Sequence, residues 1–310
     1  MKLVLDEKKI RKGRPIGLPY IGSKKKISKK LIEIIKQNFG TDKTVYDLFG
    51  GGGAITLECK LQGLDVVYND IDPIPGLMIQ KILSEDREYL KTLICSREEF
   101  FRIKDRENKD IDDHLKLLIN SFGNNSRDYI YSKKDSEFKY TLAKQIIENH
   151  NCFTGYKQTE TYKKYVTKNS RDVRLQQLRH VAQVERIIGG GTESLRIKAL
   201  ESLAVLETLK AIPSLEIENK NYKEFSNIKD SIIYLDPPYK NTIKVYKHND
   251  LDYEEFFDWC KHMGKTNIVL ISGYDMPKYF ECIFEFTKAR STLQCGTHNK
   301  KYEKLYTINN

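Results

Sequence analysis

Long hydrophobic stretches are absent from this 310-residue chain, and so is any closely spaced pair of cysteines. No apolar run approaches the roughly 20 residues that a membrane-spanning helix needs. The amino terminus, residues 1–12, is charged, which is not the pattern of a secretory signal. The six cysteines form no C-x-x-C pair. We therefore expect no metal, no disulfide framework and a reduced, cytoplasmic protein.

Two common nucleotide-binding patterns are also missing. The glycine run at residues 50–53 is not a G-x-G-x-x-G in register, and no G-K-[ST] follows it. Dinucleotide and P-loop interpretations are therefore disfavoured.

Positive charge is in excess and is concentrated in two segments. The formal net charge is +10. Residues 1–40 contain twelve Lys or Arg against three Asp or Glu, and residues 127–180 contain twelve against six. Two basic segments beside a mildly acidic remainder indicate contacts with a polyanion, most simply nucleic acid. Solvated helix faces in a lysine-rich protein are the alternative explanation.

Apolar spacing predicts an α/β fold. Helices are expected at residues 27–39 and 54–61, and strands at residues 45–49 and 65–68. Strand, glycine loop, helix and strand make a βαβ unit with a parallel sheet. The strand pattern returns late in the chain, at residues 232–235, 268–272, 279–286 and 304–308.

The middle of the chain has a different pattern of mixed helices and polar loops. Within it, leucines at near-helical spacing predict a packing helix over residues 195–209. We therefore expect one Rossmann-like α/β domain made of residues 1–75 and 216–310. It carries an inserted, mainly helical domain, residues 76–215.

The most informative residues are Asp236, Pro237, Pro238 and Tyr239, which follow the apolar run 232–235. Two prolines end sheet pairing because neither has a backbone N–H to donate. A carboxylate, carbonyl groups and an aromatic ring are thus held at the carboxyl end of a strand, where open α/β sheets bind ligands. This set suits a flat base that bears an amino group. For an isolated D-P-P-Y, an ordinary turn is the alternative.

Four elements, in this order, resemble those of the Dam-like, alpha-order, D12-class DNA adenine-N6 methyltransferases. They are Tyr20-Ile-Gly22-Ser-Lys24, Phe49-Gly50-Gly51-Gly52-Gly53, Asp70 and Asp236-Pro237-Pro238-Tyr239. Residues 269–274 and 300–305 resemble later elements of the same family. The resemblance covers residues 19–75 and 216–308 well, and the segment between them only loosely.

The resemblance implies S-adenosylmethionine as cofactor. By matching position, Tyr20 and Lys24 line its methionine end, residues 49–53 wrap it, and Asp70 holds its ribose. The implied cofactor site also takes in Gly22, Asp47 and Asp236.

At the two positions where the family contacts the cofactor adenine, an aspartate and an aromatic residue, this chain has Asn221 and Tyr222. An asparagine oxygen still accepts a hydrogen bond, but it brings no charge.

The activity implied is methyl transfer to the exocyclic amino group of an adenine flipped out of duplex DNA. Our hypothesis is that Asp236 and the Pro237 carbonyl accept the two amino hydrogens while Tyr239 stacks on the base. Transfer is then direct, and positioning and electrostatics supply most of the acceleration. The absence of a Pro-Cys nucleophile motif agrees with a reaction that has no covalent enzyme intermediate.

The inserted domain is expected to read the DNA sequence through phosphate and base-edge contacts. The candidate residues are Asn124, Asn125, Arg127, Tyr131, Lys133 and Lys134. For the two asparagines, a purely structural role in a polar turn is the alternative.

We expect a monomer in the cytoplasm of a prokaryotic cell or a phage-infected host. It acts either alone or beside a separately encoded restriction endonuclease. Two other functions stay open: methyl transfer to RNA or protein glutamine, and an inactive subunit that only recognises DNA.

Overall fold

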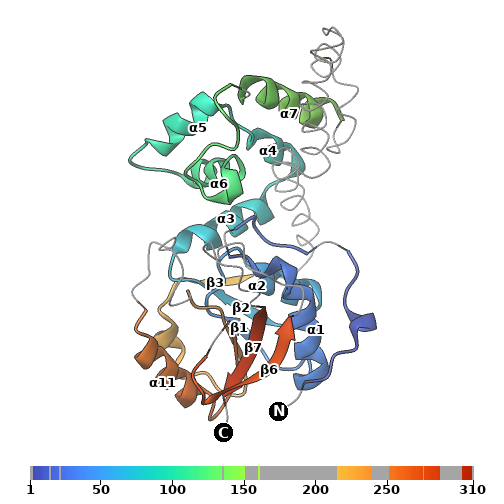
Figure 1. Ribbon diagram of the computed structural model, residues 1–310, viewed down its shortest axis with the longest axis vertical. Coiled ribbons are helices and arrows are strands. Elements are labelled where there is room, and N and C mark those ends of the chain that lie inside the picture. The colour runs from blue at the N-terminus through green and yellow to red at the C-terminus, as the bar shows by residue number, and fades with distance from the viewer. Residues whose placement is uncertain are drawn as a thin grey trace. The chain divides into compact units, whose positions relative to one another are not determined.

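The computed structural model describes residues 3–13, 15–20, 22–134, 136–150, 160, 215–238, 251–274, 276–286 and 302–308 (Figure 1). Internal contacts divide the chain into two compact units. Unit 1 consists of Met1–Gly17, Gly22–Ile79 and Leu209–Asn310, and unit 2 of Leu18–Ile21 and Gln80–Thr208.

Unit 1 is built on a mixed sheet in which the described residues form seven strands, in the order β3-β2-β1-β4-β5-β7-β6. The strands are β1 (Val45–Asp47), β2 (Val66–Asn69), β3 (Glu216–Glu218), β4 (Ile232–Leu235), β5 (Ile268–Gly273), β6 (Phe280–Phe286) and β7 (Glu303–Ile308). Strands β1 to β5 pair in parallel, whereas β7 is antiparallel to both β5 and β6. The predicted α/β class is confirmed.

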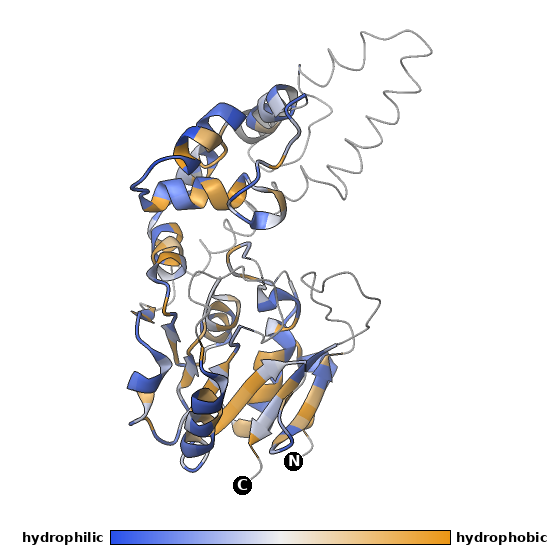
Figure 2. Cartoon of the chain, turned by 60° about the vertical axis from the view of Figure 1, so that its left-hand side comes forward, coloured by the Kyte–Doolittle hydropathy of each residue, from blue (hydrophilic) through white to orange (hydrophobic). Residues whose placement is uncertain are grey.

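Helices cover both faces of this sheet, and in Figure 1 helices α1 (Ser28–Phe39) and α11 (Tyr253–Met263) lie on opposite sides of it. Side chains along β4 point alternately to the two faces of the sheet, so this one strand contributes to the hydrophobic cores on both faces. Ile232 and Tyr234 join the cluster on the side of α1 and α2 (Ala54–Leu61), while Ile233 and Leu235 join the cluster beneath α11. The strands are accordingly mostly apolar in Figure 2.

Most predicted elements match the structure, with two differences in the sheet. The strand predicted at residues 45–49 ends at Asp47, because Leu48 and Phe49 already belong to the turn that enters the glycine run. Strand β3 was not predicted, since its three residues are Glu-Ile-Glu at an edge of the sheet. Such a short, polar segment has no strand pattern of its own.

The described part of unit 2 is mainly helical. Its helices are α4 (Arg87–Thr92), α5 (Arg97–Lys104), α6 (Ile111–Ile119) and α7 (Ser136–His150), and α3 (Pro73–Ser84) runs from unit 1 into unit 2. Side chains of Asp86, Ser96 and Asp110 cap the first turns of α4, α5 and α6. The helix predicted at residues 195–209 lies outside the described residues. Within the described ranges, no helix combines the length and apolarity needed to span a membrane.

The amino-terminal segment of unit 1 is fixed to α2 by an ion pair whose carboxylate is buried. Arg11 donates from Nε to Glu58 Oε1 at 2.6 Å and from Nη2 to Glu58 Oε2 at 2.9 Å. The Glu58 side chain, on α2, is fully buried, so its charge depends on this forked partner. In contrast, the pair between Lys30 and Glu7 involves a Glu7 side chain that is two-thirds exposed.

Arg11→Met is expected to lower the free energy of unfolding by about 2–4 kcal/mol, because it leaves the buried Glu58 carboxylate without its cation. Lys30→Met is the matched control and should change it by less than about 1 kcal/mol. Urea unfolding of both variants tests this. If Arg11→Met and Lys30→Met lower the free energy of unfolding equally, the Arg11–Glu58 pair is no more important than the Lys30–Glu7 pair and the prediction is wrong. An Arg11→Met/Glu58→Met double variant should recover much of the lost stability.

Candidate active site

The strand order of unit 1 reverses between β1 and β4. From β1 the chain continues to β2 on one side, and from β4 it continues to β5 on the other. In open α/β sheets, ligands bind outside the carboxyl ends of the strands at such a point. The side chains that follow these strands are therefore the candidate site, namely Asp47, Phe49 to Gly53, Asn69, Asp70 and Asp236 to Pro238.

The glycine run between β1 and α2 is held against β2. A Cβ on Gly50 would lie 2.3 Å from the Tyr68 ring, so only glycine fits there. The Tyr68 hydroxyl donates to the Gly51 carbonyl at 2.9 Å. Gly53, with φ of 69°, begins α2 in the left-handed region that glycine adopts without strain. The loop is thus a packed turn with a fixed shape.

Asp70, directly after β2, fixes the glycine loop through one oxygen and its own turn through the other. Oδ2 accepts from the Gly51 N–H at 2.8 Å, and Oδ1 accepts from the Asp72 N–H at 2.9 Å. Because an acidic side chain takes this glycine N–H, the loop differs from a phosphate cradle, whose N–H groups point at an anion. The predicted contact of Asp70 with a ribose stays a prediction.

Asp47 is the buried acid of the site. Its Oδ2 accepts from the Thr56 N–H at 3.1 Å and from the Thr56 hydroxyl at 2.6 Å, which caps the first turn of α2. Its Oδ1 is buried and makes no hydrogen bond to any described residue. Burial raises the pKa of Asp47 to about 7, and the nearby carboxylates of Asp236 and Asp70 also act to raise it. A hydrogen-bond donor or a cation at Oδ1 would stabilise the charged form.

An aromatic pair lies beside the loop. The rings of Phe49 and Tyr222 stack with centroids 6.0 Å apart, and Tyr222 also packs edge-on against Phe256 and Trp259 of α11. Tyr222 is buried, and burial raises its pKa to about 12, so it stays neutral. Both rings belong to unit 1, and both were predicted to contact the cofactor.

Asn221 caps the short helix η6 (Tyr222–Phe225). Its Oδ1 accepts from the Lys223 N–H, while Glu224 accepts from the Asn221 N–H, which together form a capping box. Asparagine and aspartate are equally good at this position. The departure from the family's aspartate therefore preserves the local backbone.

The segment Asp236 to Pro238, which directly follows β4 and is called the corner below, is held from two sides. Lys24 Nζ lies 2.8 Å from Asp236 Oδ2 and 3.5 Å from Glu303 Oε1. On the other side, the Tyr253 hydroxyl of α11 donates to the Pro238 carbonyl. Pro237 is buried. The structure thus brings Lys24 to Asp236, whereas Tyr239 lies outside the described residues.

The other residues of the predicted amino-terminal element divide between the units. Gly22 belongs to unit 1, is exposed and has a φ of 76°. Tyr20 belongs to unit 2 and is half-buried. Lys25 donates to the Gly17 carbonyl at 2.7 Å, and burial lowers its pKa to about 8. Of the three consecutive lysines, Lys24 is therefore the one placed at the corner.

In unit 2, the candidate DNA contacts gather around a loop formed by residues 120–130. An antiparallel bridge joins Ser121 to Tyr129, and Asn124 and Ser126 have positive φ values of 56° and 57°. Asn124 donates to the Leu118 carbonyl, and Asn125 accepts from two N–H groups and donates to Asp128. The two asparagine side chains thus hold the turn, as the structural alternative states.

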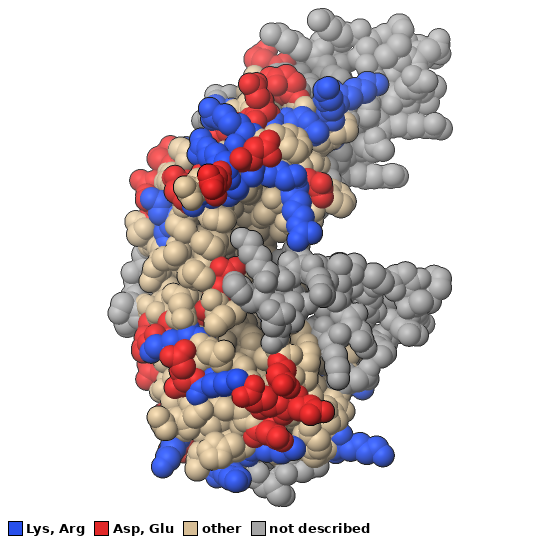
Figure 3. All heavy atoms as spheres, turned by 90° about the vertical axis from the view of Figure 1, so that its left-hand side faces the viewer, with Lys and Arg blue, Asp and Glu red and all other residues tan. Residues whose placement is uncertain are grey.

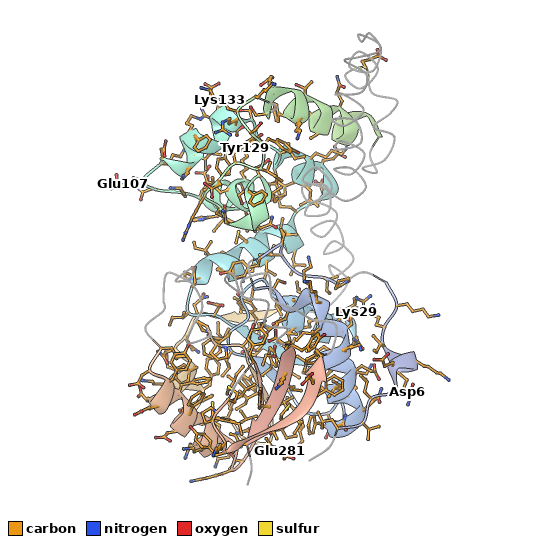
Figure 4. The ribbon with its side chains drawn as sticks, viewed as in Figure 1. Asp6, Lys29, Glu107, Tyr129, Lys133 and Glu281 are labelled. Carbon is orange, nitrogen blue, oxygen red and sulfur yellow. The ribbon has the colours of Figure 1, made fainter. Side chains whose placement is uncertain are left out.

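The remaining candidates differ in exposure. Arg127, Lys133 and Lys134 are exposed, whereas Tyr131 is only 3% exposed and packs edge-on against Tyr129 in the core of unit 2. Figure 4 shows Tyr129 inside unit 2 and Lys133 at its outside. The Tyr131 ring therefore supports the loop from within. In Figure 3 the described surface of unit 2 carries charges of both signs.

Several residues of these sites were not anticipated from the sequence. Tyr68 and Asn69 shape the loop, since Asn69 also donates to Leu48 and Lys220 carbonyls. Glu303 reaches the corner from β7. Phe122, in the 120–130 loop, is 59% exposed and is the one exposed large apolar side chain among the described residues of unit 2. Of these residues, only Phe122 could have been found from the sequence, because it is an apolar residue inside a polar turn.

The raised pKa of Asp47 predicts a pH-dependent stability. Its ordinary value is 3.8 and its folded value is about 7, so its stabilising contribution is complete below pH 4 and is lost as the pH rises to 7. Asp47→Asn keeps an acceptor for Thr56 but does not titrate. Relative to this variant, the wild type should lose about 2–4 kcal/mol between pH 4 and pH 7. Urea unfolding across this range measures it, and a constant difference would refute the assignment.

The chain matches a known protein family. Residues 20–293 match the family described as D12 class N6 adenine-specific DNA methyltransferase. No curated protein sequence matches the chain. The matched region covers most of the chain, from the Tyr20 element past β6, and includes the corner and the glycine run. The chain therefore belongs to the D12 class N6 adenine-specific DNA methyltransferase family.

Proposed function

We propose that this methyltransferase uses S-adenosylmethionine to methylate the amino group of an adenine flipped out of duplex DNA at a specific sequence. One observation carries the proposal. The Asp236-Pro237-Pro238 corner follows β4, the glycine run follows β1, and these two strands are paired neighbours at the point where strand order reverses. Unit 1 would hold the cofactor and the target base, and unit 2 would read the sequence.

The charge of the site supports a cationic cofactor. Among the described residues, Asp47, Asp70, Asp236 and Glu303 supply four carboxyl groups, and Lys24 brings an ammonium within reach of the corner. An excess of negative charge disfavours a phosphate-rich ligand. S-adenosylmethionine supplies a methyl group on a positively charged sulfur and also carries an ammonium group. Its charge therefore complements this site.

Individual residues fit this cofactor as well. The Asp47 Oδ1 atom is buried and has no hydrogen bond to a described residue, which suits an ammonium donor. Asp70 is the carboxylate proposed to hold the ribose hydroxyls. The half-buried ring of Phe49, backed by the buried ring of Tyr222, offers an apolar contact suited to an adenine ring.

Asp236 is the proposed acceptor for the target amino group. The nitrogen lone pair of that group is delocalised into the adenine ring, which makes it a weak nucleophile. When Asp236 and the Pro237 carbonyl accept its two hydrogens, the nitrogen becomes more tetrahedral and its lone pair is freed. The new N–C bond would form as the bond between the methyl carbon and the sulfonium sulfur breaks, which would leave a neutral thioether. The nitrogen would then carry the positive charge and would lose one proton to Asp236 or solvent. Positioning and electrostatics supply the acceleration.

Asp236→Ala is expected to lower methyl transfer to duplex DNA by at least about 100-fold, because the amino group loses its charged acceptor. The dissociation constant for DNA should stay within about 3-fold, since the DNA contacts are assigned elsewhere. Asp258→Ala, which removes an exposed carboxylate of α11, is the control and should retain full activity. Full activity of Asp236→Ala would exclude the proposed role.

Substrate class is tested with one labelled cofactor and three acceptors. Tritium transfer from S-adenosylmethionine should label duplex DNA and leave RNA and protein glutamine unlabelled. Transfer to RNA or protein alone would support the alternative amino-group activity, and no transfer to any acceptor would support an inactive recognition subunit. We further propose a monomer, working alone or beside a separate endonuclease.

The 120–130 loop is the proposed DNA-reading element. Phe122 exposes an aromatic ring, and Arg127 of the same loop is exposed. Exposed aromatic and basic side chains together suit base stacking and phosphate contact. Lys133 and Lys134 are also exposed and follow the buried residues 129–131.

Phe122→Ala is expected to weaken binding to duplex DNA by about 5- to 150-fold, because each base–aromatic stack contributes about 1–3 kcal/mol. Binding of S-adenosylmethionine should not change. Val4→Ala removes another exposed apolar side chain, in the amino-terminal segment of unit 1, and serves as the control. Fluorescence anisotropy with labelled duplexes measures both, and unchanged affinity of the Phe122 variant would show that the ring does not contact DNA.

A further inference from the structure

Glu303 is the first residue of β7, the strand that runs against the parallel part of the sheet. Because β7 is antiparallel to β5, its beginning lies at the carboxyl ends of the parallel strands, where Gly273 pairs with Lys304. The Glu303 side chain is only 8% exposed. A carboxylate in such a place is costly unless a cation accompanies it.

That cation is Lys24, which also serves Asp236. The ammonium lies 2.8 Å from Asp236 Oδ2 and 3.5 Å from Glu303 Oε1, and its own side chain is 11% exposed. One positive charge is therefore placed between two carboxylates in a largely buried setting. An ammonium has three donors and no acceptor, so it can serve both.

The shorter of the two contacts presents a chemical problem. Asp236, which the proposed function uses to accept an amino hydrogen, is already paired with Lys24 through its Oδ2 atom. An ammonium at 2.8 Å withdraws charge from the whole carboxylate and makes it a weaker acceptor, so the target base and the ammonium compete for its negative charge. The ammonium cannot simply leave the site, because the Asp236 and Glu303 carboxylates would then lie near each other without a cation.

We propose that Glu303 is a positioning residue that takes over Lys24 when Asp236 engages the target amino group. The ammonium needs to move by less than about 1 Å toward Glu303 to reach hydrogen-bonding distance. The charge stays paired, and Asp236 becomes available to the base. This inference rests on the proposed function and assigns to that reaction a residue from a strand with no other role in it.

The other groups at this corner do not offer a substitute. The Tyr234 hydroxyl is hydrogen-bonded to Ser272 at 2.7 Å. Burial, and after it the charges of Asp236 and Glu303, raise the pKa of Tyr234 well above its usual value, so it stays neutral. Asp47 is a further acid, but its Oδ2 atom accepts from the Thr56 N–H and hydroxyl. Among the described residues, Glu303 is the carboxylate that, beside Asp236, lies within 4 Å of the Lys24 ammonium.

The test compares Glu303→Gln, Glu303→Asp and the control Glu285→Gln in single-turnover methyl transfer to duplex DNA. Glu285, on the adjacent strand β6, has a half-exposed carboxylate 3.9 Å from Lys304. We expect Glu303→Gln to slow transfer by about 10- to 100-fold, the size of one charge-assisted hydrogen bond. Glu303→Asp should recover part of the rate, and Glu285→Gln should match the wild type.

Two readouts separate positioning from a merely structural effect. The dissociation constants of the Glu303→Gln variant for DNA and for S-adenosylmethionine should stay within about 3-fold of wild type, so the loss falls on the transfer step. In a double-variant cycle, adding Glu303→Gln to Lys24→Met should cause no further loss of rate. The proposal is wrong if the rate losses of Glu303→Gln and Lys24→Met multiply in the double variant. It is also wrong if Glu303→Gln weakens only the binding of DNA or S-adenosylmethionine.

The same assay distinguishes failure of the inference from failure of the proposed function. If the wild type methylates adenine and Glu303→Gln is equally fast, the role of Glu303 is wrong and the proposed function stands. If the wild type transfers no methyl group to adenine in duplex DNA, both are wrong.

Discussion

Parallel pairing between β1 and β4 is the constraint on which the candidate site depends. The register places Asp47 beside Tyr234, so the residues that continue from each strand emerge at the same edge of the sheet. The glycine run continues from β1 and the proline corner continues from β4. Two segments separated by almost two hundred residues in sequence are thereby neighbours. A shift of one residue in this register would turn Asp47 toward the opposite face.

Electrostatics gives this edge its chemical character. Among the described residues, acidic side chains outnumber basic ones at the ends of β1, β2, β4 and β7, and burial makes their charges expensive. The structure meets that cost in three ways. Asp70 accepts backbone N–H groups, Asp47 caps α2 while one of its oxygens lacks a partner among the described residues, and Lys24 is shared by Asp236 and Glu303. A cationic ligand would complete the pairing.

Much of this arrangement could be predicted from the sequence. The order of strands and helices predicts the α/β class. The glycine run and the D-P-P-Y corner, in their order along the chain, indicate the family. Helical spacing located α1 and α2 because their apolar faces pack on one face of the sheet. These are local patterns, and local patterns are what a single sequence displays.

The features that could not be predicted depend on tertiary contacts. Glu303 is distant in sequence from Lys24 and is brought to it by antiparallel pairing of β7. Tyr68 matters because its ring lies against Gly50, and Tyr131 is buried by neighbours that its sequence context does not identify. Asn221 illustrates the opposite case, since its helix-capping role follows from local chemistry. Tyr239 lies outside the described residues, and its stacking role stays a prediction.

The most direct test of the central claim is single-molecule sequencing of DNA from cells that express this protein. The account predicts N6-methyladenine at one recurring sequence, which would identify the target motif and the modified atom together. Unmodified DNA, or a methyl group on cytosine instead of adenine, would contradict the assignment of the corner after β4 as the site that receives the adenine.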